Sequence, residues 1–179
     1  MKIGILSDSH DRRASASDAL ALFLREGVAT VLHLGDVCSP EVLEPFRIAA
    51  VPLLGVFGNN DFDKSGLQAV SANGFHRGPH ILEVGGRKIL MSHAFDDLHS
   101  EIGEKGRFDL VLFGHTHRAL TMRVGKAVVI NPGEACGLVS GRPTCAVVDL
   151  GTMEARIIGL DGTGAGGGSG SASGAASGG

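Results

Sequence analysis

The sequence predicts an α/β protein in which two sheets face each other and helices lie outside them. Three observations support this fold class. Strands alternate with helices in the first half, which is typical of parallel strands joined by crossover helices. The second half instead contains pairs of strands separated by short turns, which indicate antiparallel hairpins. Many glycines stand just after strands, where α/β proteins build their sites.

The first half is expected to form five elements in the order βαβαβ. The strands are apolar runs, and the apolar residues of the first helix favour one side. Pro40 stands where the second helix would begin, and Pro52 follows its end. The five elements are Lys2–Ser7, Ser15–Glu26, Thr30–Leu34, Glu41–Ala50 and Leu53–Phe57.

The second half is expected to form one further strand and three hairpins. Gly85-Gly86 is a strong signal for a two-residue hairpin turn between two apolar runs. The predicted strands are His80–Val84, Arg87–Met91, Asp109–Phe113, Ala119–Val124, Ala127–Ile130, Thr144–Leu150 and Glu154–Leu160.

Length and composition indicate one globular domain. Of the 179 residues, the last 18, at 162–179, are only Gly, Ser, Ala and one Thr, so we expect a flexible tail, natural or introduced, after a domain at 1–161. The three cysteines are far apart, which predicts small buried residues and neither disulfides nor a cysteine zinc site.

The same composition limits the partners and the location. No apolar run approaches the roughly 18 residues of a spanning helix, and no signal peptide is recognisable, so the cytoplasm is the expected location. A net charge of -3 disfavours tight binding to long DNA or RNA. The composition leaves a homo-oligomer open.

Polar side chains follow five of the predicted strands, each time after the apolar run stops at Gly or Ser. The motifs are Asp8-Ser9-His10, Gly35-Asp36, Gly58-Asn59-Asn60-Asp61, Ser92-His93 and Gly114-His115-Thr116-His117. Taken singly, each could be a turn, a helix cap or a strand-end histidine. Because they recur at one kind of position, we expect them to converge on one sheet edge. Imidazole and carboxylate together suit Mn, Fe, Zn and similar ions.

These five motifs, taken in order, resemble the signature of the calcineurin-like metallophosphoesterase superfamily, and within it the short, single-domain phosphodiesterases of bacteria and archaea. The resemblance covers Met1 to about Leu160. It implies a four-layer α/β/β/α sandwich with two metal ions at the sheet edge. It also implies the ligands: Asp8, His10, Asp36 and His117 for one ion, and Asp36, Asn59, His93 and His115 for the other, with Asp36 bridging.

The family chemistry implies a two-metal phosphodiesterase that acts on small substrates. Two ions about 3.5 to 4 Å apart would activate a bridging hydroxide for in-line attack on phosphorus. The residues that the chemistry uses would be Asp36, Asn59, Asp61 and His93, with Asp61 orienting a neighbouring group such as an imidazole. The mixed nitrogen and oxygen ligands favour Mn, with Fe, Ni or Zn as alternatives.

Three positions depart from the resemblance. Position 60 is Asn, where many relatives have a His that protonates the leaving group. Ala94 replaces a common Gly, and Glu134 replaces the Ser of a loop that usually reads Asn-Pro-Gly-Ser, which we interpret as a turn supporting the site. His33, which lies inside the second predicted strand, is expected to be structural, although it could supply the missing proton.

Two other functions use the same fold. A phosphomonoesterase or nucleotide phosphatase would need the same ligands. A non-catalytic interaction scaffold would tolerate a degraded site, and the presence of a suitable residue at every ligand position argues against it.

Overall fold

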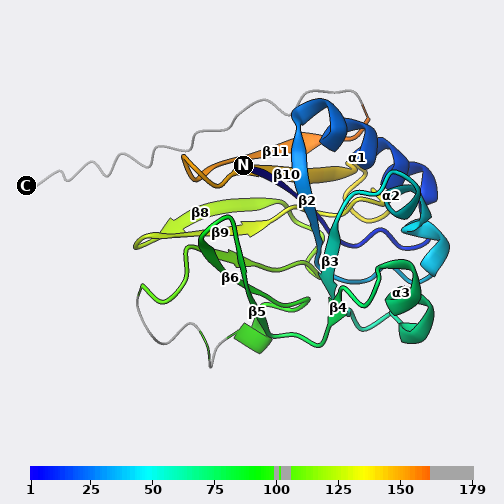
Figure 1. The fold of residues 1–179 in the computed structure, drawn as a ribbon, viewed down its shortest axis with the longest axis horizontal. Helices are drawn as coiled ribbons and strands as arrows, with labels where there is room; N and C mark the ends of the chain where they lie inside the picture. Colours follow the sequence, from blue (N-terminus) through cyan, green and yellow to red (C-terminus); the bar gives the residue numbers. More distant parts are fainter. Residues whose placement is uncertain (99–100, 102–105, 162–179) are drawn as a thin grey trace, which may run out of the picture.

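Two mixed sheets pack face to face in the computed structural model of this chain, which describes residues 1–98, 101 and 106–161 (Figure 1). The expected tail at 162–179 lies outside the described residues. The six-stranded sheet has the order β11-β10-β1-β2-β3-β4 and the five-stranded sheet the order β5-β6-β7-β9-β8. This arrangement confirms the predicted α/β class.

The strands of the six-stranded sheet are β1 (Lys2–Leu6), β2 (Val28–His33), β3 (Leu53–Val56), β4 (Phe75–His76), β10 (Thr144–Asp149) and β11 (Glu154–Gly159). Those of the five-stranded sheet are β5 (His80–Val84), β6 (Arg87–Met91), β7 (Leu110–Leu112), β8 (Leu120–Val124) and β9 (Ala127–Asn131). The helices are α1 (Arg13–Glu26), α2 (Glu44–Ile48) and α3 (Lys64–Val70), with short 3-10 turns η1 (Pro40–Val42) and η2 (Asp96–Leu98).

Strand pairing explains why one edge of the sandwich collects polar loops. Strands β1 to β4 are parallel, and so are β6, β7 and β9, whereas the expected hairpins β5-β6, β8-β9 and β10-β11 are antiparallel. The carboxyl ends of neighbouring parallel strands open at the same edge of a sheet. The loops after β1, β2, β3, β6 and β7 therefore all begin at the carboxyl ends of parallel strands.

Alternation along the strands produces the main core. Ile3 and Ile5 of β1 point toward the five-stranded sheet, where they join a fully apolar cluster with residues such as Leu110 and Ile130. The opposite face of β1 packs on α1, and Gly4 leaves room there for the ring of Phe23. Figure 1 shows α1, α2 and α3 on this side, away from the five-stranded sheet.

The outer face of the five-stranded sheet has a smaller third cluster. Its members are Leu90, Leu98, Phe108, Val111, Phe113 and Val129. Among the described residues, η2 and the chain beside it cover part of this face. Strand β8, at the edge of the sheet, is exposed along its whole length.

Three elements differ from the sequence prediction. The second helix is divided into η1 and α2, because Pro45 has no N–H to donate and can occupy only the first turn of a helix. Helix α3 and the two-residue strand β4 were not predicted. Asp63 caps α3 by accepting a hydrogen bond from the Gly66 amide.

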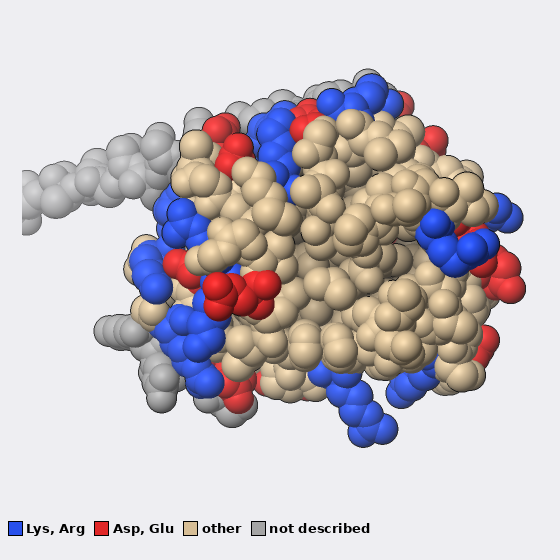
Figure 2. All heavy atoms as spheres, viewed as in Figure 1, with Lys and Arg blue, Asp and Glu red and all other residues tan. Residues whose placement is uncertain are grey.

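Charged side chains lie mostly around the outline of the face drawn in Figure 2, and acidic and basic groups are interspersed there. Much of the centre of this face carries neither kind of charge. None of the helices among the described residues is long and apolar enough to cross a membrane.

Candidate metal centre

The predicted ligands come together at one edge of the sandwich, where the two sheets meet. Asp8, Asp36 and His93 are buried and offer ligand atoms that all lie within 4.8 Å of one another. His10 and His117 form a second such group with Cys136, and their rings stack with centroids 5.2 Å apart. Asn59 and His115 are exposed at the same site. The structure thus brings together all seven residues that the motifs predict.

The two groups are continuous with each other through their carboxylates. The Asp8 Oδ1 atom lies 3.5 Å from His117 Nε2 and 3.9 Å from His10 Nε2. The Asp36 Oδ2 atom lies 3.7 Å from His10 Nε2 and 3.4 Å from His93 Nε2. Asp36 therefore stands between the buried imidazole of His93 and the stacked pair, as a bridging position requires.

Two buried polar atoms at this site have no hydrogen-bond partner among the described residues: Asp8 Oδ1 and His10 Nε2. Buried polar atoms are rarely left without a partner, because each loses its bonds to water. Burial also raises the pKa of Asp8 above its ordinary value, so the anion needs positive charge nearby. A cation between these atoms would satisfy both, so the donor set fits a bound metal ion.

A second set of atoms converges on His93. Its Nε2 lies 3.0 Å from Asn59 Oδ1 and 3.2 Å from His115 Nδ1. The other ring nitrogen, Nδ1, lies 2.8 Å from the carbonyl oxygen of Leu34. A carbonyl can only accept, so Nδ1 carries a hydrogen, and whenever the ring is neutral its Nε2 lone pair faces the site.

His117 is oriented in the same way by a carboxylate. Its Nδ1 donates to Glu134 Oε2 at 2.7 Å, which leaves Nε2 facing Asp8. A carboxylate behind a ligating imidazole fixes the ring and increases its basicity. The sequence pattern placed Glu134 in a supporting turn but did not predict this contact, because the two residues come from different loops.

Glu134 is fully buried and remains ionised. Burial would raise its pKa, but hydrogen bonds from His117, Ser140 and Cys136 outweigh this effect and hold the pKa at about 2. The backbone amides of Val139 and Ser140 also donate to it.

Asn131 supports the expected turn. Its Nδ2 donates to the carbonyl of Gly114 and to Thr116 Oγ1, at 2.9 and 3.0 Å. The end of β9 thus braces the loop that carries His115 and His117.

Asp61 contacts the backbone of a neighbouring site residue, Asp36. The Asp61 carboxylate accepts four backbone N–H groups, at 2.7 to 3.0 Å, rather than a bond from an imidazole. The donors are Asp36, Val37, Cys38 and Gly58. Asp61 therefore fixes the backbone on which the Asp36 carboxylate is mounted.

Asn60 contacts the same carboxylate. Its backbone N–H and its Nδ2 donate to the two oxygens of Asp36 at 2.8 and 2.7 Å. Burial would raise the pKa of Asp36, but hydrogen bonds from His93 and Asn60 hold it well below its usual range. Asn60 thus helps to keep Asp36 anionic.

Five of the seven predicted ligands have a left-handed backbone. The φ angles of Asp8, His10, Asp36, His115 and His117 lie between 38° and 64°. Residues other than glycine rarely adopt such angles, and strained backbone of this kind is enriched at functional sites.

Glycines make the close approach of the ligand loops possible. A side chain on Gly58 would collide with the Asp36 carboxylate, and one on Gly114 would collide with Ser7. The glycines that precede ligands in the motifs are therefore required by space.

His33 is structural, as expected. It is fully buried, its Nδ1 accepts from the Gly35 amide, and its Nε2 lies 3.1 Å from Ser9 Oγ. Burial lowers its pKa, and both ring nitrogens have partners. It is therefore not placed to give a proton to a leaving group.

Comparisons with known proteins agree with this geometry. A family model described as a calcineurin-like phosphoesterase superfamily domain matches residues 1–153. A protein of Methanocaldococcus jannaschii named as a phosphodiesterase is 34% identical over 90% of this chain and 100% of its own length. A probable metallophosphoesterase of Methanothermobacter thermautotrophicus is 30% identical over 74% of this chain and 76% of its own.

Solved structures extend the likeness. One characterised as an archaeal phosphodiesterase has a TM-score of 0.79 and 32% identity, covering 89% of this chain and 99% of that one. Two others share the fold alone. One is a phosphoesterase of E. coli, with a TM-score of 0.70 and 17% identity, covering 89% of this chain and 100% of that one. The other is vacuolar protein sorting 29 of Cryptosporidium parvum, with a TM-score of 0.59 and 19% identity, covering 88% of this chain and 95% of that one.

Proposed function

The chain belongs to the calcineurin-like phosphoesterase superfamily, and from this premise we propose that it is a phosphodiesterase that hydrolyses small phosphate diesters with two divalent transition-metal ions. Membership confirms the enzyme class expected from the motifs. The observation that carries the proposal is the pair of unsatisfied buried atoms, Asp8 Oδ1 and His10 Nε2, which lie among further donors of the kinds that such ions bind.

The proposed ligands form two overlapping sets that share Asp36. One ion would be held by Asp8, His10, Asp36 and His117, and the other by Asp36, Asn59, His93 and His115. The first set is the more buried, and the second includes the exposed Asn59 and His115. Substrate would therefore approach over the second ion.

The metal ions would supply an activated water and positive charge for the phosphoryl oxygens. The chain sets the charge of the site, because Asn59 is neutral and leaves it more positive than a third carboxylate would. Such a site suits an anionic diester. Asp61 holds the loop of Asp36, and the Leu34 carbonyl keeps the Nε2 lone pair of His93 directed into the site.

Imidazole nitrogens among the ligands favour Mn, with Fe, Ni or Zn as alternatives, over Mg or Ca, whose sites are usually built from oxygen. A cytoplasmic location, a homo-oligomeric state and the absence of long nucleic-acid partners stay predictions from the sequence.

A panel of phosphate mono- and diesters tests the proposal. The protein is first treated with a chelator, and Mn, Ni, Fe, Zn and Mg are then added back separately. We expect hydrolysis that depends on added metal, is fastest on diesters, and is stronger with Mn than with Mg. Full activity after chelation would contradict the proposal. Faster hydrolysis of monoesters would favour a phosphatase, and metal binding without any hydrolysis would favour a scaffold.

A further inference from the structure

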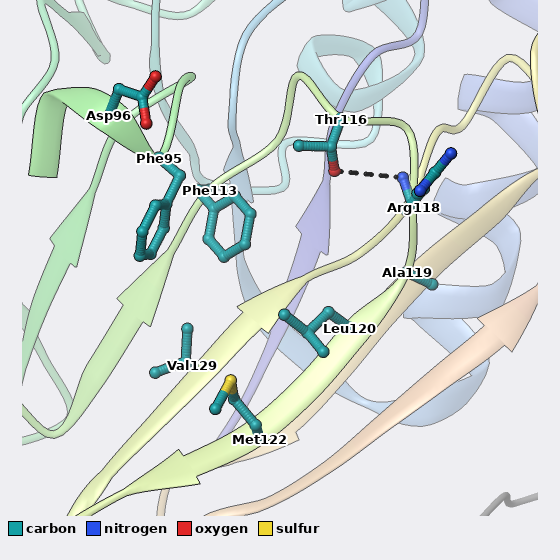
Figure 3. Close-up of a pocket in the computed structure, with 9 residues that line it drawn as sticks. All are labelled: Phe95, Asp96, Phe113, Thr116, Arg118, Ala119, Leu120, Met122 and Val129. Atoms are coloured by element: carbon teal, nitrogen blue, oxygen red, sulfur yellow. Dashed lines mark hydrogen bonds between the residues drawn. The ribbon is translucent and has the colours of Figure 1, made fainter.

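A groove lies on the outer face of the five-stranded sheet, beside the candidate metal centre (Figure 3). Its volume is about 750 Å³, within the range of roughly 300 to 1,000 Å³ that is usual for small-molecule sites. Its lining residues come from the segment after β6, the loop between β7 and β8, strand β8 and strand β9. They are Phe95, Asp96, Phe113, Thr116, Arg118, Ala119, Leu120, Met122 and Val129.

The apolar side chains of β8 in and beside the groove are exposed and do not belong to the hydrophobic core. Along β8, Leu120, Met122 and Val124 share one face, and they are 40 to 53% exposed. The opposite face of β8 includes Arg123, which reaches the carbonyl of Met153 in the loop before β11. The exposed apolar face is therefore the outer one. Such a face on an edge strand suggests a binding role.

The groove is continuous with the ligand loops. Phe95 follows His93 by two residues, Phe113 precedes His115 by two, and Thr116 lies between His115 and His117. Consecutive Cα atoms are about 3.8 Å apart, so Thr116 is one residue from two proposed ligands. Its hydroxyl accepts a hydrogen bond from Asn131, which holds this part of the groove in place beside the proposed ligands.

We propose that this groove binds a flat apolar substituent of the diester substrate while the phosphate lies at the metal centre. The inference rests on the proposed function and narrows the substrate class to diesters with at least one aromatic substituent. The substituent placed here is the one that remains on the phosphate when the other leaves.

The arrangement of side chains supports an aromatic occupant. In Figure 3, Asp96, Thr116 and Arg118 lie along one side of the groove, and Leu120, Met122 and Val129 lie along the other. The rings of Phe95 and Phe113 stand between them, with centroids 5.0 Å apart and planes at 62°. Such edge-to-face geometry, with a thioether nearby, favours a further ring. On the polar side, Thr116 is adjacent in the sequence to the proposed ligands His115 and His117.

Two substrates with the same leaving group test the proposal. Methyl 4-nitrophenyl phosphate and phenyl 4-nitrophenyl phosphate both release nitrophenolate but differ in the substituent that remains. With Mn present, we expect the phenyl ester to have a KM lower by roughly tenfold, a usual discrimination for an apolar pocket. Hydrolysis of the methyl ester tests the proposed function, and the ratio of the two KM values tests the groove.

Two variants of β8 provide a matched comparison. Met122→Gln keeps the side-chain length but puts an amide in the groove, and should raise KM for the phenyl ester about tenfold more than for the methyl ester. Val124→Gln changes the same face of the same strand outside the lining residues, and should leave both KM values as they are.

Equal KM values for the two esters in the unmodified enzyme would overturn the proposal, as would equal effects of Met122→Gln on both. If neither ester is hydrolysed, calorimetry on the metal-loaded protein replaces kinetics, with phenylphosphonate and methylphosphonate as probes. Equal affinities would then reject the groove. A Met122→Gln protein with unchanged kinetics but an altered sedimentation coefficient would instead identify the groove as a contact between copies of the chain.

Discussion

The two sheet edges that meet at the candidate metal centre contribute different proposed ligands and hold them differently. The six-stranded sheet supplies both carboxylates, and its loops are tied together through backbone bonds such as His10 N–H to the Asp36 carbonyl at 3.0 Å. The five-stranded sheet supplies only imidazoles, and His93 and His117 are fixed from behind by an oxygen acceptor. The first edge therefore sets the charge of the site, and the second sets the direction of lone pairs.

The largest effect is expected on the carboxylate side. Asp36→Asn should lower the rate of hydrolysis more than about 100-fold, because both proposed ligand sets share Asp36. This loss exceeds the usual range for a residue that only orients a ligand. Elemental analysis and hydrolysis rates are measured together, with His115→Ala as a comparison that affects one set only. An Asp36→Asn protein that keeps two metals and its activity would refute the bridging role.

The next effect concerns the support of Asp36. Asp61→Asn leaves one acceptor oxygen for four backbone N–H groups, so it should lower the free energy of unfolding by about 2 to 4 kcal/mol and reduce activity. Asp63→Asn is the matched control, because Asp63 is exposed and accepts hydrogen bonds only from Ser65 and Gly66 in the first turn of α3. Urea unfolding compares the two proteins. Equal destabilisation by both changes would show that the four hydrogen bonds to Asp61 add no more stability than a helix cap.

On the imidazole side, Glu134→Gln should weaken metal binding by about 10- to 100-fold. The amide can still accept from His117 Nδ1, but the negative charge that makes the ring more basic is lost. Calorimetric titration with Mn measures the affinity of each site. Loss of affinity at only one of two sites would support the proposal that His117 binds one of the two ions. Two unchanged affinities would show that the contact between Glu134 and His117 does not affect metal binding.

Protons and metal ions should compete for His93, which would make the metal affinity depend on pH. Burial would lower the pKa of His93, but the hydrogen bond and charge of Asp36 raise it above 6.5. In the metal-free protein this raised pKa adds stability that is complete below pH 6.5 and is lost as the pH rises through the folded value. Metal binding must displace that proton, so Mn affinity should fall about tenfold per pH unit on the acid side. A pH-independent affinity between pH 5 and 8 would contradict this linkage.

The smallest effect is expected at Asn60. Asn60→His would restore a proton donor, which is typically worth about 10² to 10⁴-fold, but it removes the Nδ2 bond to Asp36. We therefore expect a gain of only about tenfold on alkyl diesters, whose leaving groups are poor, and none on nitrophenyl diesters. Rates are plotted against the pKa of the leaving group. A flat plot for the unmodified enzyme would indicate that another group already supplies the proton.

Part of this site could be predicted because space forces a local pattern. Gly58 and Gly114 must lack side chains beside Asp36 and Ser7, so glycine followed by a polar residue marks three of the five strand ends in the sequence. The ligand positions were therefore visible without a structure.

The supporting contacts could not be predicted in the same way. Asp61 reaches amides up to 25 residues away, and Glu134 reaches His117 across 17 residues. Two elements of the fold were missed because they are short. Helix α3 has seven residues, one of which is Gly66, and strand β4 has only two. Segments this short carry no clear periodicity in the sequence.

The left-handed backbone at five ligands has a consequence for the speed of metal uptake. Such conformations cost on the order of 1 kcal/mol or more each, and the folded chain already holds them through bonds such as Asp8 N–H to the Gly35 carbonyl. An incoming ion therefore meets donors that are already in place. Its rate of entry would be governed by how fast it sheds its own water, and not by any rearrangement of the loops.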